Sequence, residues 1–231
     1  MNVVILVIIL VCCLTFLIPA ASNGVILSLL LILAVIGVIV IAKRNFDLKK
    51  HNLSKYDEDE LIIQNVRKGG VIRLTNVDGQ DEPLDLKVVD RNLYMEGDYS
   101  WYELECMDAK GEKYWVEVDD DDELVVSIVV DKPQNAEFSS SLDDIDENEA
   151  GQVKYKGRQY RYSDSGKAVF FKHCDSKHKE SLYYYDFVSG DHIFTAEKWN
   201  ETERPLYFVS QIINSYNITV YSTKGGNNKD E

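Results

Sequence analysis

Residues 101–118 read WYELECMDAKGEKYWVEV, two runs of alternating side chains on either side of a glycine-containing turn. Every second residue is apolar, from Tyr102 to Cys106 and again from Tyr114 to Val118. Successive side chains of a β-strand point to opposite faces, so this alternation is typical of half-buried strands. A glycine between them supplies the positive φ that a tight turn needs. The sequence therefore predicts a β-hairpin here.

The same alternation continues on both sides of this hairpin. Short apolar or alternating runs fall at 72–74, 84–89, 124–130, 153–155, 159–162, 168–172, 182–188, 193–198, 206–209 and 218–221. No strongly amphipathic helix lies between them. Many short strands without helices are typical of all-β folds, so we predict a mainly-β domain, a sandwich or partly closed barrel of antiparallel strands.

The N-terminal part of the chain has a different composition. Residues 1–42 contain no Lys, Arg, Asp, Glu or His, and two apolar runs, 3–18 and 25–42, flank a turn at 22–24. Each run approaches the roughly 17–20 residues that a membrane-spanning helix needs. The sequence predicts a transmembrane helical hairpin within residues 1–46. A signal peptide cleaved after residue 21 and followed by one span is the alternative, although the usual basic N-terminal region is missing.

The charges beyond the second apolar run predict an orientation. Lys43, Arg44, Lys49 and Lys50 follow it closely, and basic residues stay on the cytoplasmic side of a membrane. We therefore expect a multi-pass protein of the cell (inner or plasma) membrane with its soluble domain facing the cytoplasm. Its expected partners are the lipid bilayer and other membrane-associated proteins.

Changes in composition predict the domain boundaries. After the hairpin we expect a juxtamembrane linker, a β-rich domain made of two halves with an acidic linker between them, and a disordered tail. These segments are 47–68 for the first linker, 69–223 for the domain, 69–131 and 151–223 for its halves, 132–150 for the acidic linker, and 224–231 for the tail.

The charge balance excludes one class of function. The net charge is −14, and an acidic surface repels phosphates, so we expect no nucleic-acid partner.

The sequence contains none of the common nucleophile, nucleotide or zinc-protease motifs, and it predicts no catalytic residue, cofactor or metal site. His173, Cys174 and His178 cluster beside lysines, which favours a solvated loop over a zinc site. The acidic run 119–123 lacks the glycine and ligand spacing of a calcium loop.

Aromatic residues are the candidates for a binding surface. Such side chains either line a groove or fill the two faces of a strand. The candidates are Trp101, Trp115, Tyr183, Tyr184, Tyr185 and Trp199.

Short aromatic motifs carry a resemblance to a known family. They are W-x-E-L at 101–104, W-V at 115–116, G-R-Q-Y at 157–160, Y-Y-D-F at 184–187 and E-K-W at 197–199. Over residues 69–222 the chain resembles a bacterial β-rich domain family of unknown function, whose members often sit beside membrane or membrane-stress genes. The resemblance supplies no catalytic residues to carry over. We therefore expect a membrane-anchored, non-enzymatic binding or scaffold module in membrane maintenance or stress. The alternative is a cation or polyamine sensor that uses two acidic runs, 119–123 and 143–149.

Overall fold

The computed structural model describes residues 56–57, 60–121, 123–199 and 204–225, all within one compact unit, Ser54–Glu231. Its first part holds η1 (Ile63–Asn65), β1 (Val71–Leu74), β2 (Leu84–Glu96), β3 (Tyr99–Met107), β4 (Lys113–Asp120) and β5 (Leu124–Asp131). Then follow β6 (Glu137–Phe138), α3 (Leu142–Asn148), β7 (Gln152–Tyr155), β8 (Arg158–Phe171), η2 (Lys172–Cys174) and β9 (Lys179–Ser189). The last elements are β10 (His192–Lys198), β11 (Leu206–Ile212), η3 (Ser215–Asn217) and β12 (Ile218–Ser222).

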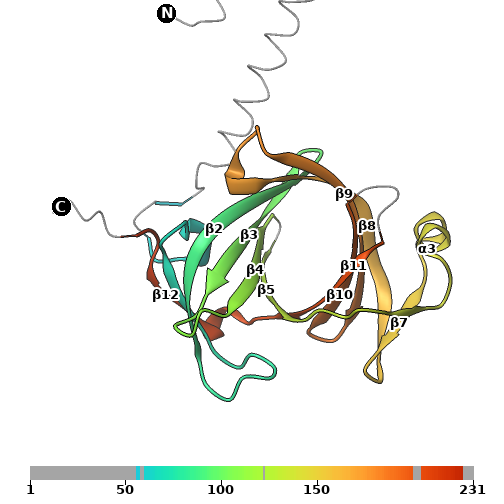
Figure 1. Cartoon of the computed structure of the whole chain (residues 1–231), viewed down its shortest axis with the longest axis horizontal. Coiled ribbons are helices and arrows are strands. Elements are labelled where there is room, and N and C mark those ends of the chain that lie inside the picture. Colours follow the sequence, from blue (N-terminus) through green and yellow to red (C-terminus); the bar gives the residue numbers. More distant parts are fainter. Residues whose placement is uncertain (1–55, 58–59, 122, 200–203, 226–231) are drawn as a thin grey trace, which may run out of the picture. The chain divides into compact units, whose positions relative to one another are not determined.

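The strands form one antiparallel sheet that closes on itself. Its order is β12-β1-β2-β3-β4-β5-β11-β10-β9-β8-β7-β6, with an additional pairing between β2 and β8. One edge of the long strand β2 pairs with β1 near Leu86 and with β8 near Leu93, which lies opposite Phe171. This pairing closes β2, β3, β4, β5, β11, β10, β9 and β8 into a barrel, visible as the ring of strands in Figure 1.

The apolar faces of the barrel strands point outward, against two covering layers. On β3 and β4 the outward residues include Leu104 and Val116, which pack in a first core with residues of β1 and η1. On β9 and β10 they include Phe187 and Phe194, which pack in a second core with Ile145 of α3. Since side chains alternate along a strand, the intervening residues of the same strands face the barrel interior.

Two segments that the sequence marks as connections contain ordered elements. In the described part of 47–68, Ile63 and Val66 are buried in the first core. The acidic segment 132–150 holds β6 and α3, and the side chain of Ile145 is fully buried. Most of the predicted tail, 224–231, lies outside the described residues.

Local chemistry explains why α3 forms within such an acidic segment. The Ser141 side chain accepts a hydrogen bond from the Asp144 backbone N–H at 3.1 Å, which caps the helix. Asp143 and Asp144 lie in the first turn, where the helix dipole favours negative charge. A Cβ atom on Gly151 would lie 2.5 Å from Cγ1 of Ile145, so only glycine allows the chain to pass this close to α3.

The predicted fold class, a transmembrane hairpin joined to a β domain, is corrected by the structure. The described chain is a single large antiparallel sheet with one short α-helix, and none of its helices has the length and apolarity needed to cross a bilayer. The runs that suggested the hairpin, 3–18 and 25–42, lie outside the described residues. The prediction rested on length and hydropathy, which are properties of composition and do not test helix formation. The multi-pass location in the cell membrane rested on the same runs and is withdrawn.

Candidate functional site

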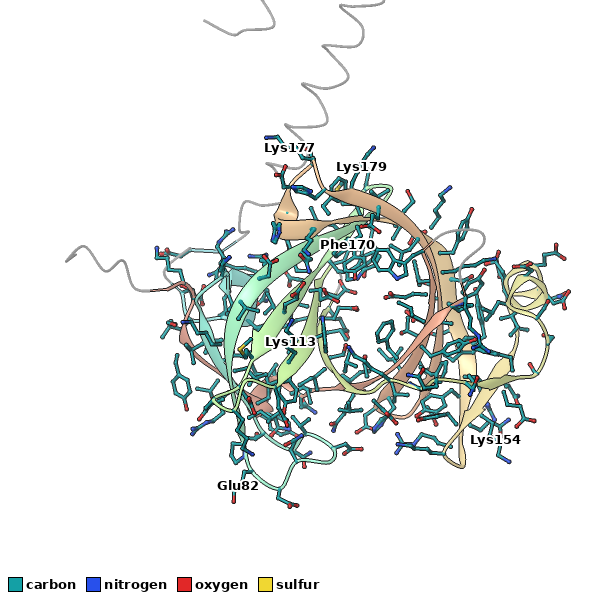
Figure 2. The ribbon with its side chains drawn as sticks, viewed as in Figure 1. Glu82, Lys113, Lys154, Phe170, Lys177 and Lys179 are labelled. Carbon is teal, nitrogen blue, oxygen red and sulfur yellow. The ribbon has the colours of Figure 1, made fainter. Side chains whose placement is uncertain are left out.

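The barrel encloses a cavity with two lobes, of about 320 and 250 Å³. The two lobes share the lining residues Tyr94, Glu117, Ser127, Thr195, Glu197 and Ser210, so they are parts of one hollow. Phe170, labelled in Figure 2, belongs to the aromatic lining of the first lobe. Each lobe is near the lower end of the size range of small-molecule sites.

Carboxylates dominate the polar lining of this barrel cavity. Four line the first lobe and five line the second; two are shared, which gives seven in all. They are Glu103, Glu105, Glu117, Asp119, Asp164, Asp186 and Glu197. Among the described residues that line the cavity, Lys132 is the only cation.

Among these carboxylates, Glu117 has a like-charged neighbour across the strand pair and lacks a hydrogen-bond donor among the described residues. On β4 it lies directly opposite Glu103 of β3, and both side chains face inward. Its side chain is exposed, and the surface it presents lines the hollow inside the barrel. Among the described residues no donor makes a hydrogen bond to it. Burial, together with repulsion from Asp186 and Glu103, raises the pKa of Glu117 well above its ordinary value.

The neighbouring carboxylates are only partly satisfied. Thr195 Oγ1 donates to Asp186 Oδ1 at 2.6 Å, and Trp199 Nε1 donates to Glu197 Oε2 at 2.9 Å. A carboxylate offers about four acceptor positions, so each of these donors leaves most of them open to the cavity. Burial raises the pKa of Asp186 to about 6 and that of Glu197 to about 8.

Glu103 has more support than Glu117. It accepts hydrogen bonds from Asn92 Nδ2 at 3.0 Å and from the Tyr94 hydroxyl at 3.4 Å. Burial nevertheless raises its pKa as well. Within this pair, Glu103 therefore accepts hydrogen bonds from described residues and Glu117 accepts none.

Aromatic faces make up much of the remaining lining. Trp101 stacks on Tyr94 with ring centroids 5.2 Å apart, and Trp199 meets Phe170 edge to face at 5.3 Å. The Lys132 ammonium lies 3.1 Å from the centroid of the Trp115 ring. Aromatic faces and carboxylates both attract cations, and the rings also offer apolar surface. The arrangement can therefore hold a positively charged group that carries an apolar stem.

The family model described as Domain of unknown function (DUF4178) matches residues 82–215, more than half of the chain. The chain belongs to this family. The match begins just before β2 and ends at η3, so it contains every strand of the barrel wall. No curated protein and no solved structure matches the chain. The match confirms the predicted resemblance to a family of unknown function. That the Trp/Tyr motifs are characteristic of this family stays a prediction.

The DUF4178 domain brings four of the six predicted surface aromatics to its cavity: Trp101, Trp115, Tyr184 and Trp199. The other two, Tyr183 and Tyr185, occupy the opposite face of β9. Tyr183 is 41% exposed, and Tyr185 is buried in the second core.

The carboxylates of the cavity were not among the predicted site residues. In strands, Glu103 and Glu117 look like the polar face that meets solvent. One feature of the sequence does point to these carboxylates: Trp101 lies on the same strand face as Glu103, and Trp115 lies on the same face as Glu117. A tryptophan on a charged face indicates that the face is enclosed, because exposing so large a ring to water is unfavourable.

The described residues of the acidic run 119–123 and of the histidine cluster at 173–178 lie outside the cavity, with the exception of Asp119. Asp119, the first residue of the acidic run, lines the second lobe and accepts a hydrogen bond from the Tyr99 hydroxyl. In the η2 region, His173 Nδ1 meets the Asp90 carboxylate. Burial raises the pKa of the Cys174 thiol to about 11, which leaves it protonated and unreactive at neutral pH.

Proposed function

We propose that this DUF4178 domain is a binding module that holds a small organic cation in the barrel cavity. Glu117 carries the proposal: its carboxylate is exposed to the hollow inside the barrel and has no hydrogen-bond donor among the described residues. Leaving such a group unpaired is unfavourable, and a cation in the hollow would supply the missing partner.

An organic ammonium matches both the negative charge and the apolar surface of the cavity lining. Its charge would offset the repulsion among Glu103, Glu117 and Glu197, and its hydrocarbon stem would lie against Trp115 and Phe170. In an enclosed site the attraction is stronger than in water, because the effective dielectric constant is lower.

The predicted alternative is a cation or polyamine sensor that uses the acidic runs. We propose instead that the cation lies inside the barrel. The carboxylates of α3, in the second run, are exposed. Attraction between exposed charges is screened at physiological salt, where the Debye length is about 8 Å. The barrel cavity suffers less screening, so it is the stronger candidate for selective cation binding.

Titration of the full chain with 1,4-diaminobutane tests the proposal. All three tryptophans of the sequence line the cavity, so tryptophan fluorescence reports on it directly. We expect saturable binding of the diamine, weaker binding of magnesium ions, and none of 1,4-butanediol, which has the same length without charge.

Glu117→Gln should weaken diamine binding by about tenfold, equivalent to about 1.4 kcal/mol. Glu82→Gln is the matched control, since Glu82 is exposed on the loop before β2, away from the cavity (Figure 2). Equal binding by the two variants, or equal binding of the diol and the diamine by the unaltered chain, would exclude a carboxylate-lined cation site.

A further inference from the structure

Lys132 contributes a cation of the chain's own to the cavity. It follows directly after β5, and its ammonium lies 3.1 Å from the Trp115 ring centroid and 5.6 Å from that of Phe208. Glu103 and Glu197 attract the ammonium electrostatically. Two aromatic rings and two carboxylates thus lie on the cavity side of one primary ammonium group, whose other side is exposed to solvent.

We propose that Lys132 is a tethered competitor that occupies the ammonium subsite of this cavity and must swing out when a ligand binds. This inference rests on the proposed function. The subsite consists of the Trp115 and Phe208 rings with Glu103 and Glu197, and it takes a primary alkylammonium group, the chemistry that the lysine side chain itself presents.

The contacts of Lys132 suit a group that can be replaced. Among the described residues no carboxylate forms an ion pair with it, so the Trp115 ring is its closest partner. Lys132 remains exposed to solvent on one side, and partial desolvation of its ammonium lowers its pKa. A free ligand ammonium that reaches the carboxylates directly would be held more strongly than this tethered one.

The backbone allows the side chain to move alone. The Lys132 backbone N–H donates to Asp131 Oδ1 at 2.9 Å, and the next residue, Pro133, is buried. The main chain is therefore fixed on both sides of a long side chain with several rotatable bonds. Swinging the ammonium into solvent opens the Trp115 face without disturbing β5.

Competition of this kind predicts how Lys132 variants of the full chain bind n-butylamine. Lys132→Ala vacates the subsite, and we expect about tenfold tighter binding than in the unaltered chain, in line with the strength of a partly desolvated cation–aromatic contact. Lys132→Arg keeps a cation over the ring and should bind about as weakly as the unaltered chain.

Removing a positive charge also strengthens cation binding by electrostatics alone, so a second measurement separates displacement from charge. Acetylation of Lys132 by acetic anhydride, followed by peptide mass spectrometry, should increase when 1,4-diaminobutane is added. Lys154, exposed on β7 (Figure 2), is the internal control and should be acetylated equally with and without the diamine.

The outcomes are distinguishable. Decreased or unchanged acetylation of Lys132 on adding diamine would overturn the displacement model, even if Lys132→Ala binds more tightly. Unchanged n-butylamine affinity in Lys132→Ala would also overturn it, and the proposed function would still stand if Glu117→Gln weakens diamine binding. Absence of amine binding by both the unaltered chain and Lys132→Ala would overturn both proposals.

Discussion

Glu103 and Glu117 lie directly opposite each other on the antiparallel strands β3 and β4, and both face the barrel cavity. Side chains in such a pair have Cβ atoms about 4.5–5.5 Å apart, and like charges at this position destabilise a sheet. Asn92 and Tyr94 donate hydrogen bonds to Glu103. No described residue donates one to Glu117, so protonation or a bound cation is needed to relieve the repulsion.

The raised pKa of Glu197 makes folding stability depend on pH. Its pKa is about 8 in the folded chain, because burial and Glu103 disfavour the ionised form, against about 4.3 when unfolded. The stability from this group is fully present below about pH 4.3 and is lost as the pH rises through about 8. Glu197→Gln should therefore stabilise the chain by about 2 kcal/mol at pH 8 and hardly at pH 4.5, measured by urea unfolding. Glu82→Gln is the control, and an equal effect at both pH values would contradict the assignment.

Cation binding should itself depend on pH. A ligand ammonium favours ionised carboxylates, and Asp186 and Glu197 have pKa values of about 6 and about 8. Affinity for 1,4-diaminobutane should therefore rise between pH 5.5 and 8.5, with protons released on binding. Calorimetry in buffers of different ionisation enthalpy measures the number released, which Glu197→Gln should reduce. Uptake of protons on binding would be inconsistent with a carboxylate site.

His192 should contribute to the stability of the barrel. It is 5% exposed, its Nδ1 lies 2.7 Å from Asp191 Oδ1, and its Nε2 lies 3.0 Å from Asp78 Oδ2. It thus joins β10 to the loop between β1 and β2. We expect His192→Ala to lower the free energy of unfolding by about 2 kcal/mol. His178→Ala, at an exposed position, is the control, and similar unfolding midpoints for both variants would argue against this role.

Ile145 should anchor the acidic segment. It is the fully buried residue of α3, and removing its side chain leaves a cavity in the second core. We expect Ile145→Ala to destabilise the chain by about 3 kcal/mol and to speed proteolysis within residues 132–150. The exposed Glu147, also on α3, provides the control as Glu147→Ala. Unchanged proteolysis in Ile145→Ala would indicate that α3 is held by other contacts.

The hairpin formed by β3 and β4 was accessible from sequence, because alternation over 101–118 is a local signal. Barrel closure was not, since it joins Leu93 to Phe171 and no local pattern specifies so distant a pairing. Alternation also defines two strand faces without saying which is enclosed. Here β1 and α3 cover the apolar faces, and the charged faces meet inside the barrel.

Only the aromatic part of the site could be predicted from the sequence. Aromatic content pointed to Trp101, Trp115 and Trp199, which line the cavity. Glu117 was missed because a glutamate on an alternating strand is ordinarily solvated. Glu117 becomes a candidate site residue only because the fold brings Glu197, 80 residues later on β10, to the same hollow.

A crystal structure of the full chain with 1,4-diaminobutane tests the cation site most directly. We predict one diamine inside the barrel, with an ammonium nitrogen within hydrogen-bonding distance, about 2.7–3.0 Å, of a Glu117 carboxylate oxygen. A diamine bound only on the outer surface, or a barrel interior that stays free of diamine at saturating concentration, would contradict the proposal.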